Sequence, residues 1–240
     1  MKKPMKKTIM ATILVATMIL GAPSAFANVS AFNEARSIQL QADALIAAVD
    51  ENSLMIDAME NVIDYSVPIS VRDSIVASAD FKPMVGIAKD AIEFEVNSTV
   101  QKIGEIVCEN GDISNMYVTA VAAEPKEDWS HKDQYGIDAW AYVYWIDNQG
   151  ENNELYAAAA EWLPQDVVVN NRQVRYGTSD IAGLFWIDGP TVQYPTDNYR
   201  KYIDPRTYSG LTLRCQTKID VVNVGTVTCN VTSGFFTKWK

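Results

Sequence analysis

The sequence predicts an α+β fold, in which an N-terminal helical segment packs on or beside a C-terminal antiparallel β-sandwich or β-barrel. Apolar residues recur at helical spacing before residue 112, whereas alternating side chains and polar turns follow it. All six tryptophans and ten of the eleven tyrosines also lie beyond residue 112. These observations divide the chain into residues 1–27, 28–112 and 113–240.

Residues 1–27 have the features of a bacterial signal peptide. Four lysines stand near the start, an apolar run follows from Ile9 to Leu20, and Ala25-Phe26-Ala27 has the small residues of a cleavage site. The apolar run is too short to span a membrane, and no later segment is long and apolar enough. We therefore expect a secreted or extracellular protein, with the periplasm as an alternative location.

The chain is acidic, with 20 Lys+Arg against 30 Asp+Glu. Residues 1–27 hold four lysines and no acids, which leaves 16 basic and 30 acidic residues, a net charge of −14. Such a charge repels nucleic acids and anionic membranes, and argues against both as partners.

Residues 28–112 have the spacing of a helical region. Apolar residues recur every three or four positions from Val29 to about Cys108, and Asn52-Ser53 is suited to start a second helix. Pro83 suits the first turn of another helix, whose apolar stripe runs from Val85 to Val107. Asn110-Gly111 would end it.

The remainder has the pattern of short strands joined by polar turns. Met116–Ala122 and Ile137–Ile146 alternate as strands do, and Glu154–Trp162 would be the returning strand of a hairpin. Its run of four alanines also favours a helix, so both structures remain open for 154–162. The later elements are strands at 167–169, 173–176 and 184–187, an irregular excursion at 190–210, and a closing hairpin of 211–222 with 226–239.

The hairpin carries wide rings on one face. If residues 146 and 154 pair, Tyr144 lies opposite Tyr156, and Trp140 lies opposite Ala160. Rings that face methyl groups leave their broad sides uncovered, so a protein layer or a ligand must cover them.

Aromatic side chains are therefore the candidate ligand-binding residues, because tyrosine and tryptophan combine a flat apolar body with a polar tip. They are Trp140, Tyr142 and Tyr144 in the hairpin, and Tyr194, Tyr199, Tyr202 and Tyr208 in the excursion. The alternative is structural: the hairpin rings form a core beneath the helices, and the excursion tyrosines lie flat on the surface.

Export permits disulfides, and three cysteines follow residue 27. Cys215 and Cys229 are fourteen residues apart in one hairpin, which places them on the same face and predicts a disulfide. Cys108 is left over, with an apolar buried role as the expectation.

The chain offers few catalytic groups. The single histidine, His131, has no cluster of ligands for a metal and no nucleophile turn to serve, and the sequence contains no phosphate-binding glycine loop or cofactor motif. A carboxylate pair remains available, with Asp138 and Glu161 near the aromatic face. We therefore expect a secreted non-catalytic protein that binds an extracellular glycan or protein; the alternatives are a secreted hydrolase using a carboxylate pair, or a structural component of the cell surface.

Overall fold

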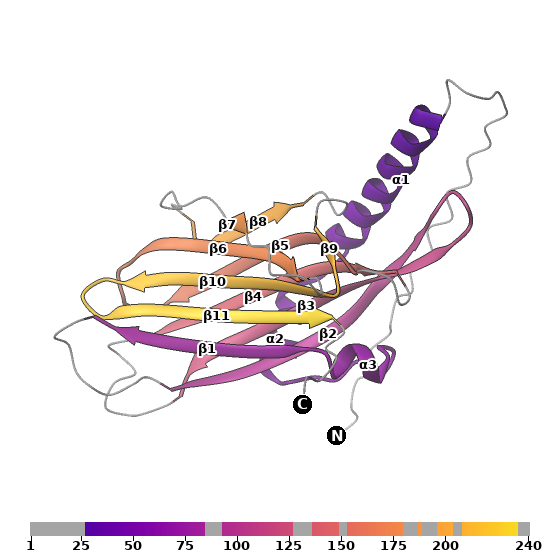
Figure 1. Cartoon of the computed structure of the whole chain (residues 1–240). Coiled ribbons are helices and arrows are strands. Elements are labelled where there is room, and N and C mark those ends of the chain that lie inside the picture. The colour runs from indigo at the N-terminus through magenta and orange to yellow at the C-terminus, as the bar shows by residue number, and fades with distance from the viewer. Residues whose placement is uncertain are drawn as a thin grey trace.

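A computed structural model of the chain describes residues 27–84, 93–126, 136–148, 153–179, 187–188, 196–203 and 208–234. Two antiparallel sheets lie face to face, and the helices of residues 27–47 and 51–59 pack against the outer face of one of them (Figure 1). Neither sheet closes on itself, so the β-barrel alternative is not observed.

The two sheets are built from strands that lie far apart in the sequence. Sheet A consists, in spatial order, of β1 (Val76–Pro83), β11 (Gly225–Gly234), β10 (Thr212–Val221), β6 (Val169–Ser179) and β7 (Ile187–Asp188). Sheet B consists of β2 (Phe94–Val107), β3 (Ile113–Pro125), β4 (Ile137–Asp147), β5 (Asn153–Pro164) and β8 (Asn198–Tyr202), with β9 (Ser209–Gly210) also paired to β5.

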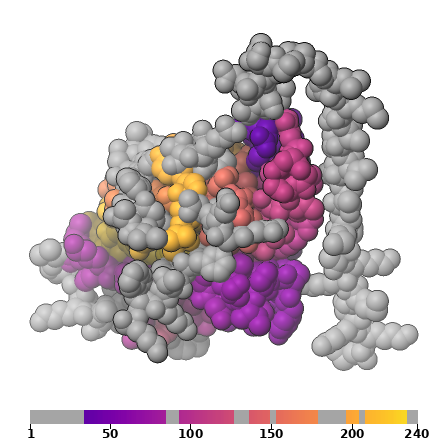
Figure 2. Space-filling view, turned by 45° about the vertical axis from the view of Figure 1, so that its right-hand side comes forward, coloured from indigo at the N-terminus to yellow at the C-terminus, as the bar shows by residue number. Residues whose placement is uncertain are grey.

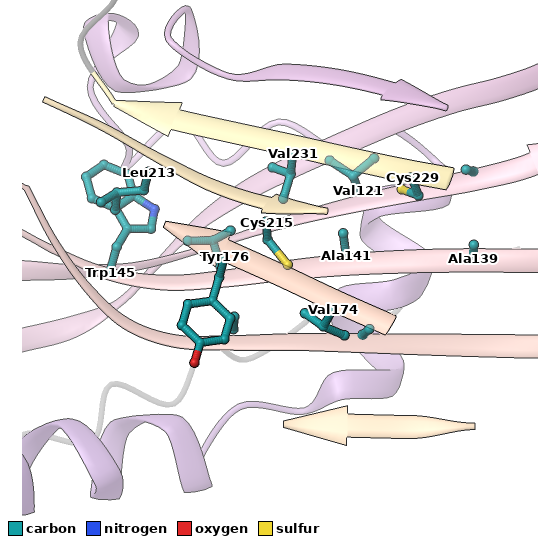
Figure 3. Packing of buried hydrophobic residues seen from close by; sticks show 14 of the residues in the cluster. Val121, Ala139, Ala141, Trp145, Val174, Tyr176, Leu213, Cys215, Cys229 and Val231 are labelled. Atoms are coloured by element: carbon teal, nitrogen blue, oxygen red, sulfur yellow. The ribbon is translucent and has the colours of Figure 1, made fainter. Parts of the chain in front are cut away.

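Two hydrophobic cores result from this layering. The first lies between the sheets and takes Ala141, Val143 and Trp145 from β4, together with residues of β6, β10 and β11 (Figure 3). The second lies between sheet B and the helices. Sheet B is therefore covered on both faces, as its nearly continuous apolar strands require.

Three helices precede the strands: α1 (Ala27–Ala47), α2 (Glu51–Met59) and the short α3 (Ile69–Arg72). The N-cap of α2 is Asp50, two residues before the start expected from the sequence. Its carboxylate accepts hydrogen bonds from the Ser53 backbone N–H at 3.3 Å and from the Ser53 hydroxyl at 2.8 Å. The sequence thus predicted a second helix correctly, but placed its start two residues too late.

The helical prediction is wrong beyond residue 75. Pro83 ends β1 instead of starting a helix, and the described part of the expected third helix is β2. Val100 faces the core between the sheets, whereas Ile106 faces the helices, and β2 has a register irregularity between Lys102 and Gly104. Apolar residues on opposite faces of an irregular strand thus imitated helical spacing. Residues 85–92 lie outside the described part.

The strand alternative for 154–162 is confirmed, because these residues belong to β5. Of the strands expected at 167–169 and 173–176, Val169 and residues 173–176 belong to one continuous strand, β6, in which Asn171 adopts a positive φ of 50°. Asparagine tolerates this conformation better than most residues, so the chain passes between the two expected strands without leaving the sheet.

The predicted disulfide is wrong: Cys215 and Cys229 are free thiols. Both lie in the core between the sheets, as their spacing indicated, with exposed fractions of 1% and 0% (Figure 3). However, Cys215 pairs with Val231, and Cys229 pairs with Thr217. The cysteines are therefore diagonal neighbours, with Cα atoms about 7–8 Å apart, whereas a disulfide needs Cα atoms closer than about 7 Å.

Candidate functional site

The hairpin rings belong to the second core. Trp140, Tyr142 and Tyr144 are 1%, 4% and 1% exposed, and they face α1 and α2. Tyr142 stands between Ala120 on β3 and Ala159 on β5. Small neighbours on both sides leave room for the wide rings to lie over the sheet, and the helices cover them. The burial supports the core interpretation of these rings.

A bulge at Tyr156 changes the pairing that was expected within the hairpin. Residues 146 and 154 do pair, but Tyr144 lies opposite Ala157, and Trp140 lies opposite Glu161. Tyr156 is the extra residue, and its hydroxyl reaches α1, where the Asp43 carboxylate accepts at 2.9 Å and the Gln39 carbonyl lies at 3.1 Å. The bulge thus links the hairpin to α1.

Strand β8 joins the excursion to the hairpin. It pairs with β5, which sets Asn198 opposite Glu161, Arg200 opposite Ala159 and Tyr202 opposite Ala157. The two groups of candidate rings, separate in the sequence, therefore meet in one sheet. We call the residues on the helix-side face of this edge the β8 strip: Glu161, Asn198, Arg200 and Tyr202.

Arg200 is held in the centre of the β8 strip. Its guanidinium forms an ion pair with Glu51 of α2, donates to the Tyr144 hydroxyl at 3.3 Å, and lies 5.3 Å from the centre of the Tyr144 ring. The Tyr144 hydroxyl donates in turn to Glu51 at 3.3 Å. Burial raises the pKa of Tyr144 above its ordinary value, so the hydroxyl keeps its proton. The ion pair fixes the strip against α2.

Tyr202 is the accessible ring of the β8 strip, with 49% of its surface exposed. Its ring centre lies 6.2 Å from that of Tyr156, and the planes meet at 81°. This edge-to-face contact is a favourable arrangement for aromatic rings. Burial raises the pKa of Tyr156, and its hydrogen bond to Asp43 acts in the same direction. Tyr202 therefore rests on a ring that is itself anchored to α1.

The other end of the strip is a carboxylate beside buried polar atoms. Burial raises the pKa of Glu161, and the neighbouring Tyr142 hydroxyl partly opposes that shift. The Trp140 indole nitrogen is buried and makes no hydrogen bond. Asp138 stands on the same face of β4 and accepts from the Gln165 side chain at 3.0 Å. The two carboxylates that the sequence singled out are thus diagonal neighbours on one face.

The remaining predicted tyrosines do not join this strip. Tyr199 and Tyr208 are partly buried against the core between the sheets, and Tyr208 lies 6.1 Å from the ring of Tyr176. Tyr194 and His131 lie outside the described residues. Reasoning from the sequence missed Arg200 and its partner Glu51, since two adjacent cations between tyrosines give no sign of a helix acid far away in the chain.

Within the part of the chain that the structure describes, no three His, Cys, Asp or Glu side chains come together as a metal site would require. None of the described helices is both long and apolar enough to cross a membrane. Comparison of the chain with protein-family models, curated proteins and solved structures finds no match.

Proposed function

We propose that the protein is exported and binds an extracellular glycan along the β8 strip, without catalysing a reaction. The observation that carries the proposal is Tyr202, an exposed ring with fixed support among ordered polar side chains. Glycans bind where a flat ring lies beside hydrogen-bonding groups. We also infer that the two stacked sheets and their helices constitute an α+β sandwich, whose edge strand β8 presents this surface.

The strip has the dimensions and chemistry for a short stretch of polysaccharide. Asn198 and Tyr202 are four strand residues apart, which corresponds to about 13 Å. Between them stands Arg200, whose ion pair with Glu51 holds it in place before any ligand arrives. Side chains that are already ordered lose little entropy on binding, which favours affinity.

The glycan proposal is tested by replacing Tyr202 with serine. We expect Tyr202→Ser to lose retention in gels that contain neutral polysaccharides, such as β-1,4-glucan or xylan derivatives, while its melting temperature changes little. Tyr65→Ser is the matched control, because Tyr65 is 82% exposed on another part of the surface. Equal retention of Tyr202→Ser and the unmodified protein would refute the proposal.

Export is tested separately. The predicted cleavage follows Ala27, so protein recovered from the culture medium or periplasm should begin at Asn28. Sequencing of its N-terminal peptide by mass spectrometry gives the answer. An intact Met1 in the protein recovered from these fractions would contradict cleavage at this point.

A second candidate function, hydrolysis of the bound glycan, is favoured by one observation. Glu161 has a raised pKa and shares a face with Asp138 beside Trp140, as a general acid and its partner carboxylate would. Glu161→Gln should then abolish the release of reducing ends while retention persists. If the unmodified protein is retained on polysaccharide but releases no reducing ends, hydrolysis is refuted and only the binding function is left.

A further inference from the structure

The outer surface of the segment from α2 to α3 is unusually apolar. Six large apolar residues within fourteen positions are between 38% and 82% exposed. They are Ile56, Met59, Val62, Ile63, Tyr65 and Ile69, which we call the α2–α3 surface. Single exposed apolar residues are ordinary, but such a concentration is a feature of interaction sites. In Figure 2, residues of this part of the chain (purple) lie on the lower surface of the molecule.

These residues are not needed to attach the segment to the rest of the protein. Its inward side chains already do so: Leu54 and Ala58 join the second core, and Val67 and Val71 join the core between the sheets. The segment is thus apolar on both sides, and only the inner side is covered by the described part of the chain.

The backbone beneath the α2–α3 surface is fixed by the edge of β2. The Asn97 amide donates to the Met59 carbonyl at 2.9 Å, and the Thr99 hydroxyl donates to the Val62 carbonyl at 2.8 Å. Both carbonyls belong to residues whose side chains form the surface. The apolar groups therefore stand in a preset arrangement, and a partner would not have to order them.

The charges around the α2–α3 surface are almost all negative. Six acidic residues and one cation, Arg72, lie in positions 50–73. Glu51 is already paired with Arg200, which leaves five acids, and Arg72 stands over the Tyr65 ring at 5.5 Å. An anionic membrane would be repelled, and so would a second copy that presents the same surface across a twofold axis. A basic partner would be attracted.

We propose that the α2–α3 surface binds a basic amphipathic segment of another protein, with an apolar stripe against the six residues and lysine or arginine toward the surrounding acids. This mode resembles the docking of amphipathic helices on apolar surfaces ringed by acidic side chains. It does not rest on glycan binding, because none of the six residues of the α2–α3 surface belongs to the β8 strip.

The test uses the purified protein and a synthetic amphipathic peptide of about five helical turns, with leucine on one face and lysine on the other. A second peptide carries glutamate in place of every lysine. Fluorescence anisotropy should show that the basic peptide binds with a dissociation constant on the order of micromolar, and that the acidic peptide does not bind. Ile63→Ser and Glu60→Lys should each weaken binding at least about tenfold.

Leu40→Ser is the matched control, since Leu40 is 62% exposed on α1 and outside the α2–α3 surface, and it should bind as the unmodified protein does. If Ile63→Ser lowers the melting temperature, Tyr65→Ser replaces it as the probe. The proposal is overturned if the basic peptide does not bind. It is also overturned if the Ile63 and Tyr65 variants bind the peptide as tightly as the unmodified protein does. An Ile63-dependent dimer in sedimentation, or Ile63-dependent retention on anionic phosphatidylserine vesicles, overturns it as well.

Discussion

The alanines of β5 are as important to the fold as the rings they accompany. Ala157 and Ala159 face the helices beside Tyr144 and Tyr142, whereas Ala158 and Ala160 face the core between the sheets. Both faces of β5 are therefore crowded by neighbours, and a methyl group is what fits. This explains why a run with high helix propensity forms a strand, since packing outweighs an intrinsic preference below about 1 kcal/mol per residue.

At Gly225, even the addition of one methyl group should destabilise the fold. A Cβ atom there would stand 2.4 Å from the Lys82 backbone oxygen and 2.6 Å from the Phe81 ring. The backbone of β1 cannot withdraw without breaking its pairing with β11. We expect Gly225→Ala to lower the free energy of unfolding by about 3 kcal/mol, measured by urea denaturation.

Gly104→Ala provides the comparison for that prediction. Its Cβ would come within 2.3 Å of the end of the Leu45 side chain, which can rotate away. The expected loss is therefore about 1 kcal/mol. If Gly104→Ala proved the more harmful of the two, backbone contact at Gly225 would not be the controlling factor.

At the scale of elements, the helices protect an open edge of sheet B. Strand β2 has no strand partner on its outer side among the described residues, and such edges invite pairing with other chains. Here Gln41 of α1 pairs with Val107 as a strand would, donating to its carbonyl and accepting from its N–H, both at 3.0 Å. Further along, Asn97 and Thr99 bond to the segment after α2.

We therefore expect Gln41→Ala to expose the end of β2. The Val107 amide should exchange its hydrogen at least about tenfold faster, and the protein should lose about 1–2 kcal/mol of stability. Hydrogen exchange followed by mass spectrometry or NMR measures the first effect. Gln39→Ala, two positions earlier on α1, is the control and should leave Val107 unchanged. Unaltered exchange in Gln41→Ala would show that the side chain does not protect the edge.

The same elements show what the sequence could reveal. Alternation identified β3, β4 and the β10–β11 hairpin, because each has one consistent pattern along its length. It failed for β2, whose apolar residues change face along the strand. It also failed to fix register: the bulge at Tyr156 moved Trp140 opposite Glu161, and the two cysteines became diagonal neighbours. Register depends on contacts across strands, which one sequence does not encode locally.

The candidate site was predictable in its residue types and not in its assembly. Tyr202 was identified because it lies in a polar, aromatic excursion, yet its support by Tyr156 arises only when β8 pairs with β5. Likewise, nothing near Arg200 in the chain indicates its ion pair with Glu51. Contacts between segments that lie far apart in the sequence result from topology, so they become visible only in the folded molecule.

For the molecule as a whole, charge is distributed unevenly between the layers. Residues 28–166 contain 25 acidic and 7 basic side chains, whereas residues 167–240 contain 5 acidic and 9 basic ones. The first part supplies the helices and most of sheet B, and the second supplies most of sheet A together with β8. The acidic surroundings of the α2–α3 surface are therefore part of a general asymmetry, and binding there should weaken as salt concentration rises.

The protein should also lose stability in alkaline solution, because several of its buried groups resist ionisation. Burial raises the pKa of Cys229 from 9.0 to about 12 and that of Tyr117 from 10.0 to about 12, and it raises the pKa of Cys215 in the same direction. These groups stay protonated in the folded chain while the unfolded chain ionises. Their contribution to stability is thus complete below pH 9 and is lost as pH rises from 9 to about 12.

Urea denaturation at intervals from pH 7 to 12 should show a level free energy of unfolding that declines above pH 9. A Cys215→Ala/Cys229→Ala variant should postpone the decline to about pH 10, where tyrosine ionisation begins in the unfolded chain. A free energy that stays constant to pH 12 in the unmodified protein would mean that these side chains are not buried as described.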